Sequence, residues 1–538
     1  MTYVFIIYNI NVWSAPFEVE KEFYIMFNKV YSSAVLGVDG TIISVESDVN
    51  DGLPMFTMVG YLSSSVKEAG ERVRTALKNS GFHMPPKRIT INLSPANMRK
   101  DGSGFDLAIA ISIIMSMGIL PVIDMEKTII IGELSLDGTV KGVKGVLPMV
   151  YHAFNNGFTR CIVSVENAEE ASLVEGLEVV GVDSLGESID YIQGIAVSNP
   201  YKKESDINKQ CKIKKDVDFA DIKGQDMLKR GMEIAAAGFH NVLMTGAAGA
   251  GKSMLAKRLP TIMPELSFEE RVEVTKIYSI CGLLEDTTAL MKNRPFRSPH
   301  HTISNYALVG GGINPKPGEV SLAHNGVLFL DELPEFNKNV LEVMRQPLED
   351  RKITISRVSA SYVFPADFML VAAMNPCPCG NFPDMKKCIC TPNQIRRYQG
   401  KISGPLLDRI DINMEVKPIK YNELFGENKG ENSKSIRNRV EEATLIQKRR
   451  YKDEGICFNS QLESGLIKKY IKLEPTVEQY LEETFVKKGL SARGIFRILK
   501  LARTIADLDG KEDIQYIHLQ EAVFYRNSGR IAGEEGEI

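Results

Sequence analysis

The segment that most constrains the fold runs from Gly246 to Ser253 and reads Gly-Ala-Ala-Gly-Ala-Gly-Lys-Ser. It fits the P-loop pattern G-x-x-x-x-G-K-[ST], in which the lysine reaches the β- and γ-phosphates and the hydroxyl holds Mg²⁺. Backbone N–H groups wrap the phosphates, and large side chains would block that approach. The residues expected to bind a nucleotide are therefore Gly246, Ala247, Ala248, Gly249, Ala250, Gly251, Lys252 and Ser253.

The segments on either side of this loop agree with the pattern. Residues 241–245 form a short apolar run, and residues 253–259 have helical spacing before Pro260. A P-loop leaves a buried strand and enters a helix, whereas a chance glycine-rich turn needs neither. The sequence therefore predicts an α/β domain built around this loop.

A second apolar run, residues 326–330, ends in the two carboxylates Asp331 and Glu332. Such a run is typical of a strand buried in a parallel sheet. Asp331 would emerge at its carboxyl end and join Ser253 in holding Mg²⁺. Glu332 is placed to polarise the attacking water. Strand ends are commonly acidic, but after a P-loop in the same domain this run indicates a Walker B strand.

Three further polar residues are candidates for the reaction. Asn375 follows a third apolar strand and can orient the water near the γ-phosphate, although an asparagine before proline is also a common turn. Arg409 follows an apolar pair, and an arginine supplied in trans stabilises the charge of phosphoryl transfer. Arg493 opens a helix and is a candidate for contacting the γ-phosphate in cis. Judged by spacing alone, each arginine is better explained as a surface residue.

Four cysteines lie just after the third strand, in the pattern C-x-C…C-x-C: Cys377, Cys379, Cys388 and Cys390. Four thiolates so close together suit a tetrahedral zinc ion. The spacing is tighter than the usual C-x₂₋₄-C, and a cysteine-rich turn without metal is the alternative. The adjacent pair His300 and His301 is not a metal candidate, because neighbouring side chains point in different directions.

Composition bounds the class of protein. The chain has 538 residues, enough for about three domains, and 44% apolar with 25% charged residues is ordinary for a soluble globular protein. A net charge of −3 excludes a uniformly basic protein but leaves room for a basic channel. The longest apolar run, residues 107–123, contains serines, glycine and proline, which predicts a buried helix and no membrane span. Without a convincing signal peptide we expect a cytoplasmic protein with reduced or metal-bound cysteines.

Composition shifts divide the chain into segments. Two stretches read as linkers, one rich in lysine and the other rich in glycine and charge. Regular patterning begins at Met26, which is a candidate for the true start. The predicted segments are an N-terminal extension (1–25), a first domain (26–198), a linker (199–218), the P-loop domain (219–416), a linker (417–433), a helical domain (434–530) and a tail (531–538).

The motifs together resemble a magnesium-chelatase-like AAA+ ATPase of the YifB/ComM family. The resemblance spans residues 26–530 and is carried by residues 219–225, 294–302, 318–326, 403–411 and 502–507. It implies that Asn375 is sensor 1, Arg409 the arginine finger and Arg493 sensor 2 of a helical lid. It also implies a homo-oligomeric ring, usually a hexamer, with ATP at the subunit boundaries. Residues 309–313 resemble the mobile loop that relatives carry before Walker B.

The first domain resembles the Lon-protease-like α+β domain, a fold shared with a domain of a ribosomal protein. Residues 100–106 and 132–144 carry this likeness. A Lon-type protease needs a serine nucleophile beside a lysine base, but the two corresponding positions hold Gly104 and Pro148. Ser103 with Lys141 or Lys144 is a weaker candidate dyad. We therefore expect a scaffold or partner-binding domain.

Two classes of function fit these observations. The family likeness implies an ATP-driven DNA motor, acting in branch migration or as a helicase on branched or single-stranded DNA during recombination or natural transformation. Residues 448–452 and the pair Arg396–Arg397 are candidate DNA contacts, although basic runs on helices are more often solvated faces. The alternative is a protein-remodelling or chelatase-like ATPase without a DNA substrate. An ATP-dependent protease is the third interpretation and requires the dyad that the sequence lacks.

Overall fold

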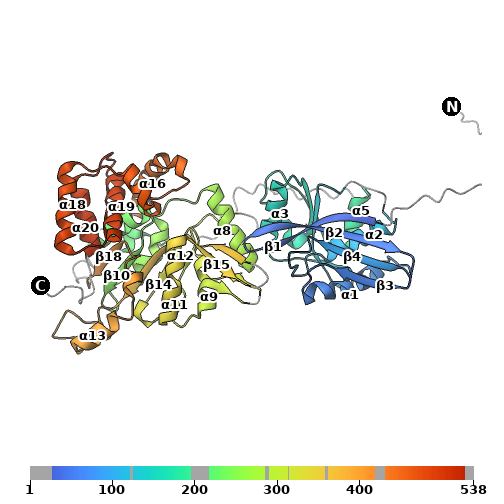
Figure 1. The fold of residues 1–538 in the computed structure, drawn as a ribbon, viewed down its shortest axis with the longest axis horizontal. Helices are drawn as coiled ribbons and strands as arrows, with labels where there is room; N and C mark the ends of the chain where they lie inside the picture. The colour runs from blue at the N-terminus through green and yellow to red at the C-terminus, as the bar shows by residue number, and fades with distance from the viewer. Residues whose placement is uncertain are drawn as a thin grey trace, which may run out of the picture.

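The computed structural model describes residues 27–120, 125–195, 217–284, 290–312, 314–357, 361–418 and 430–527. Figure 1 shows three regions along the long axis: an N-terminal domain, a central domain and a group of C-terminal helices. Met26, the tail and most of both predicted linkers lie outside the described residues. No helix among the described residues is long and apolar enough to cross a membrane.

The N-terminal domain is built on a seven-stranded mixed sheet with strand order β3-β4-β2-β1-β5-β8-β9. Strand pairs β1–β2 and β2–β4 are antiparallel, and the remaining neighbours are parallel. The sheet strands are β1 (Phe27–Leu36), β2 (Asp39–Asn50), β3 (Met55–Val59), β4 (Arg88–Ser94), β5 (Thr128–Ile131), β8 (Arg160–Ser164) and β9 (Glu178–Val182). Two further strands, β6 (Glu133–Leu134) and β7 (Val140–Lys141), form a separate antiparallel pair. Its helices are α1 (Ser64–Asn79), α2 (Asp106–Ser116), α3 (Val146–Asn155), α4 (Val165–Ala171) and α5 (Leu185–Ile192). Every residue of α2 is buried, which confirms the predicted core helix.

The central domain contains a five-stranded parallel sheet with strand order β11-β14-β17-β10-β18. These strands are β10 (Val242–Gly246), β11 (Phe296–Arg297), β14 (Val327–Leu330), β17 (Met369–Met374) and β18 (Ile412–Val416). Because β14 and β17 are buried along their whole length, polar side chains must lie beyond their ends. This strand order places the strand before Asn375 between the P-loop strand and the Walker B strand.

Helices and two small hairpins surround this sheet. The hairpins pair β12 (Gly310–Gly311) with β13 (Lys316–Pro317), and β15 (Lys352–Ser356) with β16 (Ser361–Pro365). The α-helices are α6 (Asp226–Gly238), α7 (Lys252–Arg258), α8 (Phe268–Cys281), α9 (Asn305–Val309), α10 (Glu319–Leu322), α11 (Lys338–Val343), α12 (Arg345–Asp350), α13 (Pro392–Gln399) and α14 (Gly404–Leu407). Short 3₁₀ turns are η1 (Phe219–Asp221), η2 (Leu259–Thr261) and η3 (Leu333–Glu335).

The C-terminal helices share one hydrophobic core with the central sheet. They are α16 (Ser433–Arg450), α17 (Ser464–Tyr470), α18 (Pro475–Lys488), α19 (Ala492–Leu508) and α20 (Tyr516–Asn527), with 3₁₀ turns η4 (Lys452–Glu454) and η5 (Asn459–Gln461). The basic run at residues 448–452 is partly structural: Tyr451 is fully buried, and Arg450 pairs with Asp507 at 2.6 Å. Its centre is therefore not the solvated basic face that a DNA contact requires.

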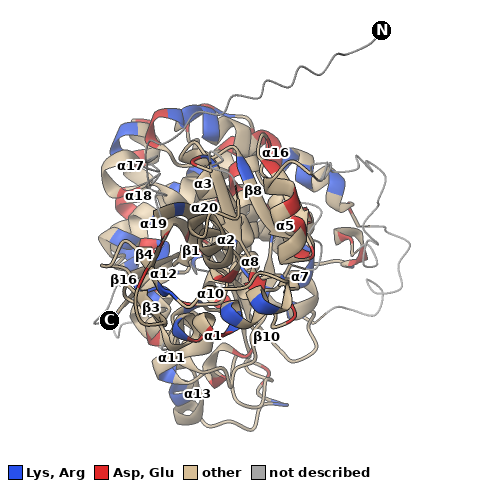
Figure 2. Cartoon of the chain, turned by 90° about the vertical axis from the view of Figure 1, so that its right-hand side faces the viewer, with Lys and Arg blue, Asp and Glu red and all other residues tan. Residues whose placement is uncertain are grey.

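Helix α8 joins the central domain to the N-terminal domain, as Figure 1 shows. The Ser279 hydroxyl donates to the buried carboxylate of Glu170, which also accepts the Leu147 N–H at 2.9 Å. Burial raises the pKa of Glu170. Near the start of β2, Asp39 pairs with Lys276 at 3.2 Å. In the view of Figure 2, basic and acidic residues are interspersed, consistent with the small net charge.

Candidate nucleotide-binding site

The glycines of the P-loop have two different structural roles. Gly249 and Gly251 have φ values of +75° and +94°, in the left-handed region that favours glycine. Gly246, the last residue of β10, needs glycine for a different reason: an added Cβ would lie 2.3 Å from the Val416 carbonyl oxygen of the neighbouring strand. The loop conformation and its packing against β18 therefore both depend on these residues.

Lys252 lies in the centre of the site. Its ammonium donates to the carbonyl oxygens of Gly246 at 2.5 Å and Ala247 at 2.9 Å, and to the Asn375 amide oxygen at 3.1 Å. Burial lowers the pKa of Lys252, while the nearby Asp331 and Glu332 carboxylates oppose this shift. The structure thus brings the predicted sensor 1 residue to the P-loop lysine.

The two predicted magnesium ligands are in direct contact. The Ser253 hydroxyl donates to Asp331 Oδ2 at 2.6 Å. The other Asp331 oxygen accepts the Glu332 N–H at 3.0 Å, which fixes the carboxylate. Adjacent oxygen ligands of an octahedral magnesium site are about 3 Å apart. Ser253 and Asp331 therefore fit a shared Mg²⁺ ion.

Glu332 lies in an unusual environment that the sequence did not reveal. Its φ is +53°, which is rare for a residue with a side chain, and such strain is often found at functional sites. Its exposed carboxylate lies 3.5 Å from His301 Nδ1, and the rings of His300 and His301 are 4.1 Å apart. This contact arises because β11 and β14 are parallel neighbours, so the segments that follow them meet at one edge of the sheet. The sequence excluded the His300–His301 pair as a metal site and gave no indication of the contact between His301 and Glu332.

Arg409 lies at the opposite edge of the sheet from the P-loop of its own chain. It precedes β18, whose first residue, Ile412, pairs with Val242 at the start of β10. The P-loop begins at the far end of β10, about 13 Å further along the strand direction. The Arg409 side chain is buried, donates to the Pro405 carbonyl at 2.7 Å and pairs with Glu349.

Arg493 lies on the same side as Arg409. It stands in the first turn of α19 and pairs with the same carboxylate, Glu349, at 3.5 Å. One turn further along α19, Arg497 donates to the Arg409 carbonyl at 3.1 Å. Arg493 therefore lies beside Arg409 and not beside the P-loop of its own chain. This position does not favour the predicted contact of Arg493 with the γ-phosphate in cis.

The four clustered cysteines converge as a metal site requires. All four sulfur atoms lie within 4.8 Å of one another. The Cys377 sulfur is 3.4 Å from that of Cys379 and 3.8 Å from that of Cys388. Zn–S bonds of 2.3 Å in a tetrahedron place sulfurs about 3.8 Å apart. The cluster, completed by Cys390, could thus hold a metal ion.

The candidate protease dyad is not formed by the described contacts. The Ser103 hydroxyl donates to the Glu133 carboxylate, which is not a lysine base. Lys141 is exposed, and Lys144 lies against Gly282 of the central domain. The second expected position, Pro148, is buried in α3.

Together, the parallel sheet, the P-loop, the paired Ser253 and Asp331 and the helical C-terminal region define a magnesium-chelatase-like AAA+ protein. Family models agree over most of the chain. "Magnesium chelatase, subunit ChlI" matches residues 218–424, "Subunit ChlI of Mg-chelatase" matches residues 45–167, and "Magnesium chelatase, subunit ChlI C-terminal" matches residues 430–526.

Similar proteins identify the family more narrowly. The chain is 41% identical over 505 residues to the uncharacterized protein YifB of Salmonella typhimurium, covering 93% of this chain and 97% of that protein. It is 42% identical over 508 residues to competence protein ComM of Haemophilus influenzae, covering 93% and 98%. The chain therefore belongs to the YifB/ComM family of magnesium-chelatase-like proteins.

Proposed function

We propose that the protein hydrolyses ATP with Mg²⁺ as a homo-oligomeric ring, most simply a hexamer. One observation carries this proposal: the reactive groups are divided between two edges of one sheet. Lys252 and Asp331 lie at the carboxyl edge, and Arg409 lies at the amino edge. Phosphoryl transfer is accelerated when an arginine joins the P-loop and the metal ligands. A neighbouring subunit is the natural source of that arginine.

Each residue then has a defined role. The loop N–H groups and Lys252 bind the phosphates, for which Lys252 exchanges its present carbonyl partners. Ser253 and Asp331 would hold Mg²⁺, which neutralises phosphate charge when bound. Glu332 orients and polarises the water, and Asn375 lies close enough to Lys252 to assist.

We further propose that the four-cysteine cluster holds a structural Zn²⁺. The loop that carries it follows Asn375 directly and lies against the P-loop, since a Cβ on Gly380 would be 3.8 Å from the Ala248 nitrogen. A closed four-cysteine site serves structure and leaves no ligand position for chemistry. Its expected contribution is to hold Asn375 in position.

The substrate we propose is branched or single-stranded DNA, moved by the ring during recombination or transformation. The likeness to a protein named for competence supports this. A candidate DNA-binding element is the hairpin β15–β16 together with the glycine-rich loop of β12, because Arg357 donates to the Gly312 carbonyl at 3.1 Å and links the two. The N-terminal domain, which we propose to be Lon-like and non-proteolytic, anchors this assembly through α8.

The decisive experiment measures ATPase activity per subunit against protein concentration, with and without forked DNA, together with oligomer size. We expect the specific activity to rise steeply as subunits assemble and to rise further with DNA. A specific activity independent of concentration would refute the shared site. Concentration dependence without DNA stimulation would instead favour a protein-remodelling ATPase.

A further inference from the structure

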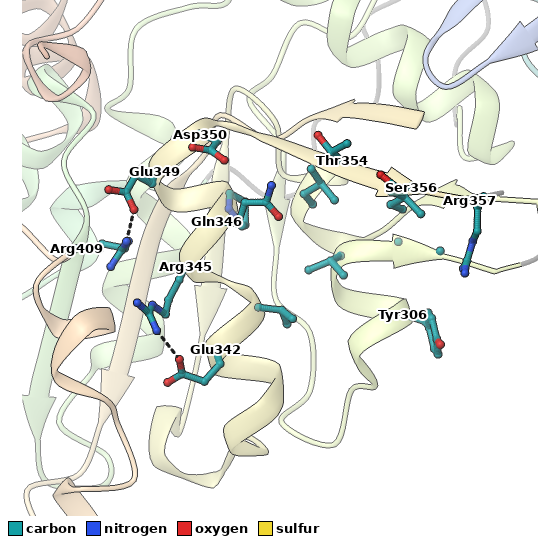
Figure 3. A pocket seen from close by; sticks show the side chains of 17 residues that line it. Tyr306, Glu342, Arg345, Gln346, Glu349, Asp350, Thr354, Ser356, Arg357 and Arg409 are labelled. Atoms are coloured by element: carbon teal, nitrogen blue, oxygen red, sulfur yellow. Dashed lines mark hydrogen bonds and ion pairs between the residues drawn. The ribbon is translucent and has the colours of Figure 1, made fainter. Parts of the chain in front are cut away.

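A cavity of about 730 Å³ opens at the face that carries Arg409. Figure 3 shows that α12 forms one wall of it and the β15 strand another. Pockets of this size commonly accommodate small-molecule ligands such as nucleotides. The P-loop of the same chain does not contribute to its lining. The cavity is therefore distinct from the nucleotide site that one subunit builds alone.

A second arginine, Arg345, lines this cavity together with Arg409. Glu342 at the end of α11 and Arg345 and Glu349 of α12 all line this cavity. Arg345 donates to Glu342 at 2.9 Å, and Arg409 pairs with Glu349. Arg345 and Arg409 are thus each held by a carboxylate, whereas Arg357, which also lines the cavity, donates to the Gly312 carbonyl.

Both guanidinium groups are incompletely satisfied. The Nε atoms of Arg345 and Arg409 are buried without a hydrogen-bond partner among the described residues. A buried donor without a partner is unfavourable, and a new acceptor removes this cost. Phosphate oxygens are suitable acceptors because they bind guanidinium groups in bidentate geometry.

We propose that Arg345 is an additional catalytic arginine, which reaches together with Arg409 the triphosphate bound by the P-loop of the neighbouring subunit. Glu342 and Glu349 hold the two side chains in place until the phosphates replace these carboxylates. Arg493, which shares Glu349, lies on the same face. This inference rests on the proposed ring ATPase and extends it to a residue outside the arginine-finger motif.

The test mixes two variants that fail for different reasons. Arg345→Ala keeps an intact P-loop. Lys252→Ala keeps an intact arginine face, the surface formed by Arg345, Arg409 and Arg493. We expect Arg345→Ala to lower kcat at least tenfold with unchanged binding of a fluorescent ATP analogue, since an arginine supplied in trans contributes about 10³–10⁵ in rate. In an equal mixture with Lys252→Ala, about a quarter of the head-to-tail boundaries combine two intact halves. Activity should therefore reappear on mixing.

Two controls make the outcomes separable. Arg409→Ala mixed with Lys252→Ala calibrates recovery for the predicted arginine finger. Arg74→Ala removes a comparable i,i+3 pair with Glu71 from the N-terminal domain and should leave activity unchanged. Full activity of Arg345→Ala alone would overturn the proposal, as would recovery with Arg409→Ala but not with Arg345→Ala. If neither mixture recovers while wild-type activity depends on concentration, Arg409 does not act in trans and the role of Arg345 falls with it. A wild-type specific activity that does not depend on protein concentration would refute the proposed ring itself.

Discussion

Asp411 connects the arginine face to the C-terminal helices, and Asp411→Asn should strongly destabilise this part of the protein. The carboxylate is 5% exposed, accepts the Asn241 N–H at 3.1 Å and pairs with Arg497. It also lies 3.5 Å from the ring of His240. Burial alone would raise the pKa of Asp411, but Arg497 and His240 outweigh this effect and hold the pKa well below its usual range.

The expected loss of unfolding free energy follows from the partners of Asp411 that stay buried after the substitution. Removing one member of a buried ion pair costs about 3–5 kcal/mol, because the other charge stays buried without compensation. Asparagine keeps one oxygen acceptor, so we expect Asp411→Asn to lose about 3 kcal/mol of unfolding free energy, the lower end of this range. Since Arg497 also donates to the Arg409 carbonyl, the variant should lose ATPase activity below its unfolding transition as well.

The measurement is denaturant unfolding followed by circular dichroism. Asp408→Asn is the matched control, because Asp408 lies three residues earlier, is half exposed and pairs with Arg526 at 3.7 Å. Because the Asp408 carboxylate is half exposed, solvent screens this long pair, and we expect it to contribute about 0–1 kcal/mol. A loss below about 1 kcal/mol for Asp411→Asn, or an equal loss for both variants, would refute the reasoning.

The pH dependence gives an independent check. A carboxyl group whose folded pKa is depressed stabilises the protein above its unfolded pKa, about 3.9 for aspartate, and this stabilisation is lost as the pH falls further. The difference in unfolding free energy between wild type and Asp411→Asn should therefore be constant near neutrality and shrink below about pH 4. A difference that grows on acidification would contradict the assignment.

Three other predictions concern the site. Lys252→Ala should abolish binding of a fluorescent ATP analogue. Glu332→Gln should bind the analogue, with kcat for ATP hydrolysis reduced at least a hundredfold. Normal turnover by Glu332→Gln would disprove the role of Glu332 as the base. His301→Ala should free Glu332, raise basal ATPase activity several-fold and reduce the stimulation by DNA. The His301→Asn variant should behave more like the wild type. An unchanged ratio of DNA-stimulated to basal activity would show that the 3.5 Å contact has no role. Protein purified without chelators should contain one zinc per chain by mass spectrometry. Cys379→Ser should lose this zinc, and its ATPase activity should fall because Asn375 loses its support. Metal-free native protein with full activity would exclude the site.

The local sequence was sufficient to predict the nucleotide loop and the candidate metal ligands. The P-loop and the Walker B strand are contiguous motifs, and their chemistry depends on backbone geometry within a few residues, so Lys252, Ser253 and Asp331 were predictable. The four cysteines were predictable for the same reason, since they fall within one short loop. The buried helix α2 could be read from continuous apolarity.

Only the tertiary structure decided which distant residues meet. The strand order β11-β14-β17-β10-β18 brings Asn375 to Lys252 and His301 to Glu332, and no local pattern specifies which strands become neighbours. Packing also turned part of a basic run into core, since Tyr451 lies inside the C-terminal helices.

The arginine face shows this division most clearly. The sequence assigned Arg409 to a neighbouring ATP and Arg493 to the ATP of its own chain, but it gave no position in space for either side chain. The parallel pairing of β10 and β18 decided the position of Arg409, because it separates the start of one strand from the end of the other. Glu349 pairs with both Arg409 and Arg493, so Arg493 lies beside Arg409. Arg345 of α12 lines the same cavity as Arg409. Motifs fix the chemistry of single residues, whereas the edge of the sheet on which each residue lies is set by long-range packing.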